Sequence, residues 1–146
     1  MQVDKKYTTT SYKQTQELGE DLAKEILKLP AQKTAVVLAL SGNLGGGKTT
    51  FLQGLAKGLG IKEKILSPTF VVMKRFNNFY HIDCYRMKDE KDASALNLKE
   101  IIANPKNIVA IEWPERIKKI LPKNTIKITF KFLDDKTREI IFKIPG

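Results

Sequence analysis

Several features are absent from this sequence. Cys84 is the only cysteine among the 146 residues, which excludes an internal disulfide and makes the cytoplasm the expected location. No apolar run approaches the roughly 20 residues that cross a bilayer, and the first six residues lack the apolar stretch of a secretory signal. Internal repeats, linkers and low-complexity segments are also missing. With 42% hydrophobic residues, the chain is not disordered, and we expect one domain over residues 1–146.

Acidic residues are scarce relative to basic ones. Asp and Glu number 16 against 26 Lys and Arg, a formal net charge of +10. Such a balance favours a polyanionic partner, namely RNA, DNA or an acidic protein surface. The lysines are spread along the chain rather than clustered, so a lysine-rich composition with solvated faces is the simpler interpretation.

One stretch carries a specific chemical signal. Residues 42–49 read Gly-Asn-Leu-Gly-Gly-Gly-Lys-Thr and fit the phosphate-binding pattern G-x-x-x-x-G-K-[ST]. An apolar run of strand length, Val36–Ser41, precedes them, and apolar residues at helical spacing follow over residues 49–59. The chain therefore predicts a strand, a glycine loop and a helix, which is the context that the pattern requires.

The residue types of this loop suit a triphosphate. Gly45, Gly46 and Gly47 allow the backbone to turn successive N–H groups inward, where they add to the positive end of the following helix. Lys48 would place an ammonium on the β- and γ-phosphates, and Thr49 would offer its hydroxyl to Mg²⁺. The alternative is a glycine-rich turn that binds nothing.

Two acids compete for the metal side of the site. Glu112 ends the apolar strand that begins near Asn107, and a buried strand of this kind delivers an acid to the edge where phosphates lie. Asp83 lies on a second, largely apolar strand, where an unpaired carboxylate would be costly. We rank Glu112 first as the magnesium ligand, directly or through water. Asp83 would then orient water or hold Lys48.

Other polar residues have less specific readings. Ser67 and Thr69 flank Pro68 on an extended segment, which is either an ordinary turn or a switch that senses the γ-phosphate and its metal. His81 is expected to be a hydrogen-bonded core histidine, and Cys84 inert packing.

Periodicity and turn residues predict the remaining elements. A strand formed by residues 6–12 is expected at a sheet edge, followed by a helix capped by Thr15 that carries a stripe of leucine and isoleucine and stops at Pro30. The further expected elements are a hairpin of residues 70–76 and 79–85 turning at Asn77-Asn78, helices over residues 89–103 and 114–122, and a C-terminal hairpin of residues 126–132 and 138–144. Together they predict an α/β protein, a P-loop NTPase-like three-layer fold with a mixed central sheet and a C-terminal β-hairpin.

Four ordered motifs resemble one family. They are Gly-x-Leu-Gly-x-Gly-Lys-Thr-Thr at 42–50, Ser-Pro-Thr at 67–69, His-Ile-Asp-Cys-Tyr-Arg at 81–86 and Ile-Glu-Trp-Pro-Glu-Arg at 111–116. In this order and spacing they resemble the TsaE family, small bacterial ATPases of tRNA threonylcarbamoyladenosine biosynthesis. The likeness extends over nearly the whole chain.

The resemblance implies a function and a set of residues. Members bind ATP with Mg²⁺, hydrolyse it slowly alone, and work with the TsaB and TsaD subunits, which modify an adenosine beside the anticodon; any contact of TsaE itself with tRNA is expected to be indirect. The residues implied are Asp83, Lys48 and Glu112 for catalysis, Thr49 and Glu112 for the metal, and for ATP contacts Gly45, Gly46, Gly47, Lys48, Thr49, Thr50 and Thr69, with Tyr12 and Arg138 at the adenine.

Three alternatives belong to other classes. A small-molecule kinase could use the same loop, but it usually adds a mobile, arginine-bearing lid, where this chain is predicted to have a hairpin. A GTPase is disfavoured because neither an Asn-Lys-x-Asp nor an Asp-x-x-Gly motif occurs. A basic RNA-binding module would not need an intact phosphate loop with two candidate metal-side acids.

Overall fold

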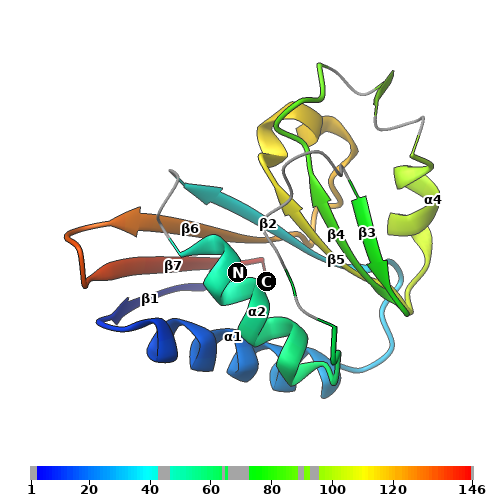
Figure 1. The fold of residues 1–146 in the computed structure, drawn as a ribbon. Coiled ribbons are helices and arrows are strands. Elements are labelled where there is room, and N and C mark those ends of the chain that lie inside the picture. The colour runs from blue at the N-terminus through cyan, green and yellow to red at the C-terminus, as the bar shows by residue number, and fades with distance from the viewer. Residues whose placement is uncertain are drawn as a thin grey trace.

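The computed structural model is built on one mixed β-sheet (Figure 1). It describes residues 3–42, 47–63, 65, 73–88, 91–92 and 96–145. The seven strands lie in the order β1-β7-β6-β2-β5-β4-β3. The elements are β1 (Val3–Thr9), α1 (Tyr12–Leu27), β2 (Val36–Gly42), α2 (Lys48–Gly58), β3 (Met73–Phe76), β4 (Phe79–Asp83), α4 (Leu98–Ala103), β5 (Ile108–Glu112), the 3-10 helix η1 (Pro114–Ile120), β6 (Ile126–Phe132) and β7 (Arg138–Ile144).

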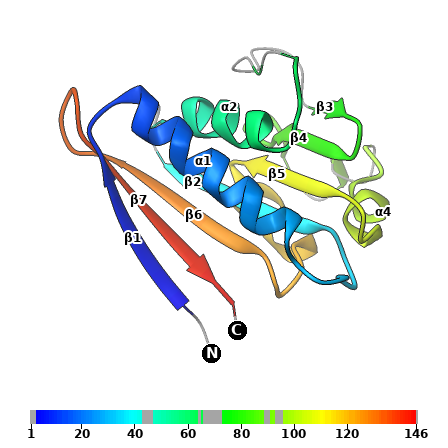
Figure 2. The same ribbon diagram turned by 90° about the horizontal axis from the view of Figure 1, so that it is seen from below.

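Strand directions divide the sheet into a parallel centre and antiparallel edges. β2 runs parallel to both β5 and β6, and β4 runs parallel to β5. β7 is antiparallel to β6 and β1, and β3 is antiparallel to β4. The predicted C-terminal hairpin is therefore part of the main sheet: β6 lies directly beside the central strand β2. Figure 2 shows that both chain ends lie at one end of the sheet.

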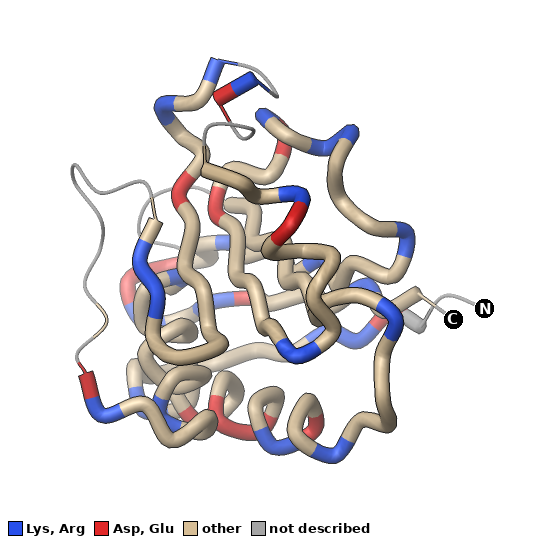
Figure 3. Tube along the Cα trace, turned by 90° about the vertical axis from the view of Figure 1, so that its right-hand side faces the viewer, with Lys and Arg blue, Asp and Glu red and all other residues tan. Residues whose placement is uncertain are grey.

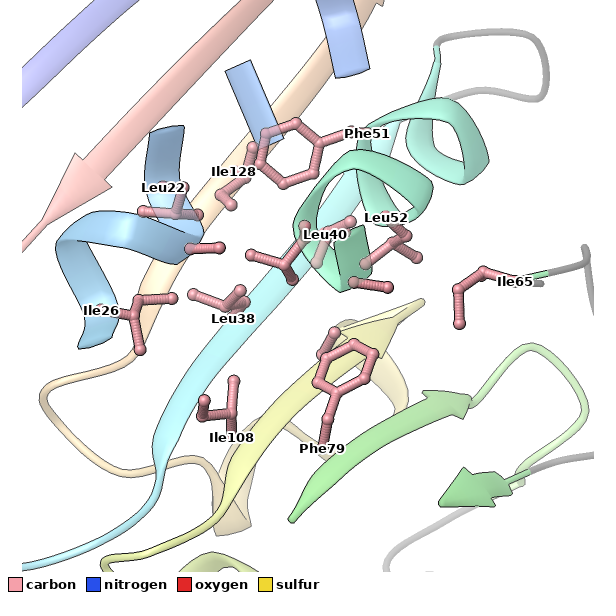
Figure 4. Close-up of a cluster of buried hydrophobic side chains, with 14 of the residues drawn as sticks. Leu22, Ile26, Leu38, Leu40, Phe51, Leu52, Ile65, Phe79, Ile108 and Ile128 are labelled. Atoms are coloured by element: carbon pink, nitrogen blue, oxygen red, sulfur yellow. The ribbon is translucent and has the colours of Figure 1, made fainter. Parts of the chain in front are cut away.

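Helices cover both faces of the sheet, which confirms the three-layer prediction. On one face α1 and α2 pack together over β2 and β6 (Figures 1 and 2). Leu22 of α1 and Phe51 of α2 meet Leu38 and Ile128 of the strands in this cluster (Figure 4). On the other face Leu98 of α4 and Ile117 of η1 pack with side chains of β2, β4 and β5.

The start of α1 corrects one prediction. Ser11, not Thr15, caps this helix, because the Ser11 side chain accepts a hydrogen bond from the backbone N–H of Gln14. Thr15 lies inside the helix, and its buried hydroxyl is 2.7 Å from that of Thr9. The predicted edge strand is present as β1, but it ends at Thr9, so Tyr12 belongs to the helix.

Other boundaries differ from the predictions by a few residues. The apolar stripe of α1 includes Leu22 and Ile26, and the helix ends at Leu27, before the predicted stop at Pro30. The left-handed Asn77 confirms the predicted hairpin turn, and β4 ends at Asp83 rather than at residue 85. Of the predicted helix over residues 89–103, α4 covers only the last six residues; residues 89–90 and 93–95 lie outside the described part, as do residues 70–72 of the predicted first hairpin strand. No helix among the described residues is both long and apolar enough to cross a membrane.

Gly54 permits the close approach of α1 and α2. A Cβ at this position would lie 1.9 Å from the carbonyl oxygen of Gln16 in the backbone of α1. In an open helix, replacing glycine by alanine stabilises by about 1 kcal/mol. Here we predict the opposite: Gly54→Ala lowers the free energy of unfolding by about 1–3 kcal/mol, measured by urea titration, because it forces the helices apart. The exposed control Lys24→Ala should change it by less than about 0.5 kcal/mol.

Cys84 should behave as an inert core thiol. It is fully buried, and burial together with the charge of Asp83 raises its pKa from 9.0 to about 12. Because the folded pKa is the higher one, this group stabilises the fold fully below pH 9.0, and its contribution is lost as the pH rises toward about 12. We expect slow labelling by a thiol reagent at pH 8 in the native protein and fast labelling in denaturant. Equal rates in both conditions would contradict the burial.

Candidate functional site

A cavity lies where the central strand β2 gives way to α2. Its volume is about 530 Å³, within the range of small-molecule sites. Among its lining residues are Tyr12 of α1, residues 47–50 at the start of α2, Glu112 of β5 and Arg138 of β7. The structure thus brings most of the predicted site residues to one place, at the carboxyl ends of parallel strands where α/β proteins bind ligands.

The first turn of α2 forms one wall of this cavity. Gly47 precedes the helix with a φ of 97°, a left-handed conformation that glycine adopts without strain. Lys48, Thr49 and Thr50 follow as the first helical residues and also line the cavity. The free N–H groups of a helix N-terminus and its dipole favour an anion here. The predicted contacts Gly45, Gly46 and Thr69 lie outside the described residues.

Lys48 is a buried cation within this wall. Its exposed fraction is 6%. Its ammonium donates to the carbonyl oxygen of Gly42 at 2.9 Å and lies 5.1 Å from the ring centroid of Trp113. Within the described part of the chain, no carboxylate lies within ion-pair distance of it. A buried charge without an opposite charge is costly, so this position is suited to a bound anion.

Glu112 reaches the cavity from the neighbouring strand, with an exposed fraction of 7%. Its Oε2 is 2.7 Å from Nε2 of His81, which is also buried. The prediction for His81 was a generic core histidine, and the pairing with Glu112 was not foreseen. Strand periodicity contains part of the signal, because His81 lies opposite Ala110, two residues before Glu112 on the same face of the sheet.

Asp83 is the neighbour of Glu112 in the sheet register but has a different environment. It is half-buried at the end of β4, and its Oδ1 accepts a hydrogen bond from the backbone N–H of Tyr85. The structure does not pair it with Lys48, which was one of its two predicted roles. The other role, orienting water, stays a prediction.

The residues predicted to contact adenine lie at the rim. Tyr12 is 76% exposed, so its ring is free of the core and available to a ligand. The Arg138 guanidinium stacks over Phe132 at 4.4 Å and donates to the carbonyl oxygen of Asp134 at 2.6 Å. Both residues line the same cavity as Lys48. The polar wall at the start of α2 suits the phosphates of a nucleotide, and the rim with Tyr12 and Arg138 suits its base.

The donor set also fits magnesium. Thr49 and Glu112 line one cavity and offer a hydroxyl and a carboxylate oxygen, the hard donors that Mg²⁺ takes in proteins. Magnesium at such sites is usually held by one or two protein oxygens together with substrate phosphates and water. Among the described residues, no three His, Cys, Asp or Glu side chains gather into a metal cage.

Fold and site together define a class: an α/β protein whose central parallel strand leads to a helix N-terminus beside a cation-bearing cavity. A family model for "Threonylcarbamoyl adenosine biosynthesis protein TsaE" matches residues 9–140. The chain belongs to the TsaE family.

Individual relatives agree with this assignment. The chain is 41% identical over 129 residues to a Bacillus subtilis protein, covering 84% of this chain and 80% of that one. It is 32% identical over 146 residues to an Aquifex aeolicus protein, covering 96% of each. Both relatives are named tRNA threonylcarbamoyladenosine biosynthesis protein TsaE. The crystal structure of Bacillus subtilis YdiB superposes with a TM-score of 0.80 at 32% identity, covering 100% of this chain and 88% of that chain.

The His81–Glu112 contact can be tested by unfolding. Replacing His81 by Leu leaves a buried carboxylate without its partner, and we expect the free energy of unfolding at pH 7 to fall by about 1–3 kcal/mol. His81→Gln, whose amide can still donate, should lose less. Adding Glu112→Gln to His81→Leu removes the stranded charge and should recover part of the loss. Equal losses for His81→Leu and His81→Gln would contradict the assigned contact.

Proposed function

We propose that this chain is the ATP-binding, slowly hydrolysing subunit of tRNA N6-threonylcarbamoyladenosine biosynthesis. One observation carries the proposal. Lys48, at the N-terminus of α2, is buried without an ion-pair partner among the described residues, and it lines one cavity with Thr49 and Glu112. Membership of the TsaE family and the names of the relatives supply the pathway. Among the described residues nothing favours the kinase alternative, because the C-terminal segments are strands of the sheet rather than a lid.

We assign each residue of the site a role according to its position. The N–H groups of the first turn of α2 and the ammonium of Lys48 hold the phosphate chain. Thr49 and Glu112 hold Mg²⁺, which when bound would neutralise charge on the β- and γ-phosphate oxygens. Asp83, next to Glu112 in the sheet, orients the attacking water. Thr69 is assigned the role of a sensor that responds to the γ-phosphate.

The rim of the cavity is assigned to the adenine base of ATP. Tyr12 offers an exposed ring for stacking on adenine, and Arg138 is held in place by Phe132 and by the carbonyl oxygen of Asp134. An aromatic face and a guanidinium plane both stack on nucleobases. We therefore assign these two residues to the base and residues 47–50 to the phosphates.

The proposal includes partners. We infer that the chain acts in the cytoplasm with TsaB and TsaD, the subunits that transfer the threonylcarbamoyl group to tRNA. ATP binding would fix the segment 67–69 against the γ-phosphate and its metal. Hydrolysis would release this segment and return the complex with TsaB and TsaD to its starting state. Turnover by the isolated chain is expected to be slow, as the family resemblance implies.

One prediction of this proposal concerns the buried ammonium of Lys48. Lys48→Ala removes the charge on the phosphates and should weaken ATP binding at least about 10- to 100-fold, the equivalent of about 1.5–3 kcal/mol for a charged hydrogen bond. Isothermal titration calorimetry with ATP and Mg²⁺ measures the change. The control Lys57→Ala alters an exposed lysine on the same helix, which pairs with Glu20, and should bind as wild type does. Unchanged ATP affinity in Lys48→Ala would show that the site is wrongly assigned.

A further prediction of this proposal concerns the partner subunits TsaB and TsaD. Phosphate release from ATP should rise severalfold or more when TsaB and TsaD are added to the wild-type chain, and should stay at background with Lys48→Ala. Stimulation by a small metabolite that becomes phosphorylated, in place of stimulation by these subunits, would restore the kinase alternative.

A further inference from the structure

Six lysines gather around two concavities on the side of the molecule that carries η1. One concavity, of about 420 Å³, is lined by Lys118, Lys123, Lys127 and Lys143. The other, of about 430 Å³, is lined by Lys99 and Lys119. Lys118 and Lys119 are consecutive residues of η1, so the linings of the two hollows are neighbours along the chain. We call these six residues the lysine strip.

The fold compensates the positive charge of the strip only in part, through Asp4 of β1, which lies opposite Lys143 in the sheet. Neither concavity has an aspartate or glutamate in its lining. Within the described part of the chain none of the six lysines has an ion-pair partner, whereas Lys6, Lys57 and Lys131 each pair with a glutamate. Figure 3 marks the basic positions along the chain in blue and the acidic positions in red. The strip is thus a clustered charge, which the spread of lysines along the sequence had concealed.

Two of these lysines oppose each other directly. Lys127 of β6 and Lys143 of β7 are register partners in an antiparallel pair, and both are exposed. Like charges at directly opposite positions destabilise a sheet. On its other side Lys143 lies opposite Asp4 of β1, which offsets part of this repulsion. A bound polyanion would offset the rest.

The lining indicates which part of a polyanion fits. Neither hollow is lined by an aromatic residue, so bases have no stacking platform of the kind used for single strands. Lysine ammonium groups act as point charges toward phosphate, and phosphate contacts position a nucleic acid without reading its sequence. The floor is held in shape by the Thr125 hydroxyl, which donates to the carbonyl oxygen of Pro122 at 2.6 Å.

The strip is separate from the nucleotide cavity. Arg138 lies opposite Phe132 at the turn end of the β6–β7 pair, and Lys143 lies opposite Lys127 near its other end. The two positions are five residue steps apart along β7, about 17 Å at 3.3 Å per residue. Figure 2 shows this pair running from the start of α1 toward the C-terminus. Substitutions in the strip can therefore be made without touching the cavity.

We propose that the lysine strip binds the phosphate backbone of folded RNA. The choice of RNA rests on the proposed function, because the relatives are named for a tRNA modification. The chain then contacts tRNA directly, where the resemblance had implied an indirect relation, and it does so at a surface distinct from the ATP site.

The test uses the full chain and a fluorescently labelled, unmodified tRNA transcript, with binding followed by anisotropy over a series of salt concentrations. Lys127→Gln/Lys143→Gln should weaken binding about 10-fold or more at low salt and reduce the slope of log K against log[salt] by about 1 per lysine removed. Its melting temperature should stay close to that of wild type, because the repulsion between the two lysines and the attraction of Lys143 to Asp4 are removed together. The control Lys24→Gln/Lys28→Gln removes the same charge from exposed positions at α1 and should weaken binding much less.

Three results would overturn the proposal: no tRNA binding by wild type at about 50 mM salt, equal losses in both double variants, or equal affinity for polyglutamate, which would assign the strip to an acidic protein. ATP binding is measured on the same samples. A wild-type chain that binds tRNA through the strip but does not bind ATP would refute the nucleotide site alone. Variants that keep ATP affinity while losing tRNA support the strip independently of that site.

Discussion

The burial of one ammonium at a helix N-terminus is the constraint on which the site depends. Lys48 begins α2 and is almost fully removed from solvent, so its charge adds to the positive end of the helix dipole rather than opposing it. Two positive contributions at one point are unfavourable in the free protein. The same helix offsets the cost a few residues later, where Phe51, Leu52 and Leu55 are fully buried in the core.

The structure holds its buried charges apart. Glu112 lines the same cavity as Lys48, yet its carboxylate bonds to His81, and the ammonium of Lys48 bonds to a backbone carbonyl. A direct Lys48–Glu112 ion pair would neutralise both charges and leave little for a ligand. Separate partners, a backbone carbonyl for Lys48 and His81 for Glu112, fix the positions of the two side chains. The cavity can therefore attract phosphate at one wall and a cation at the other, which is what a nucleotide–magnesium complex requires.

The sequence was sufficient wherever a structure depends on near neighbours. The strand before the loop, the helix after it and the strands of the C-terminal hairpin were all predicted correctly, because spacing and turn chemistry decide them. Tertiary contacts decided the rest. Serine and threonine are both favoured at helix N-caps, so residue type alone does not choose between Ser11 and Thr15. In the structure Ser11 is the N-cap, and Thr15 lies inside the helix with its hydroxyl against that of Thr9. The His81–Glu112 bond and the lysine strip join residues that are distant along the chain, and strand periodicity indicates only the face on which His81 lies, not its partner.

The cavity is completed by the two ends of the chain. Pairing of β1 with β7 places Thr9 opposite Arg138, and the chain then turns into α1 so that Tyr12 and Arg138 line the same hollow. The wall at α2 can form from a local strand–loop–helix unit, but the rim cannot, because it needs an edge strand paired with the last strand of the sheet. The proposed phosphate contacts therefore rest on local structure, whereas the contacts proposed for the base rest on the longest-range pairing in the sheet. This difference explains why the phosphate motif was legible in the sequence and why the rim residues could be assigned only by resemblance.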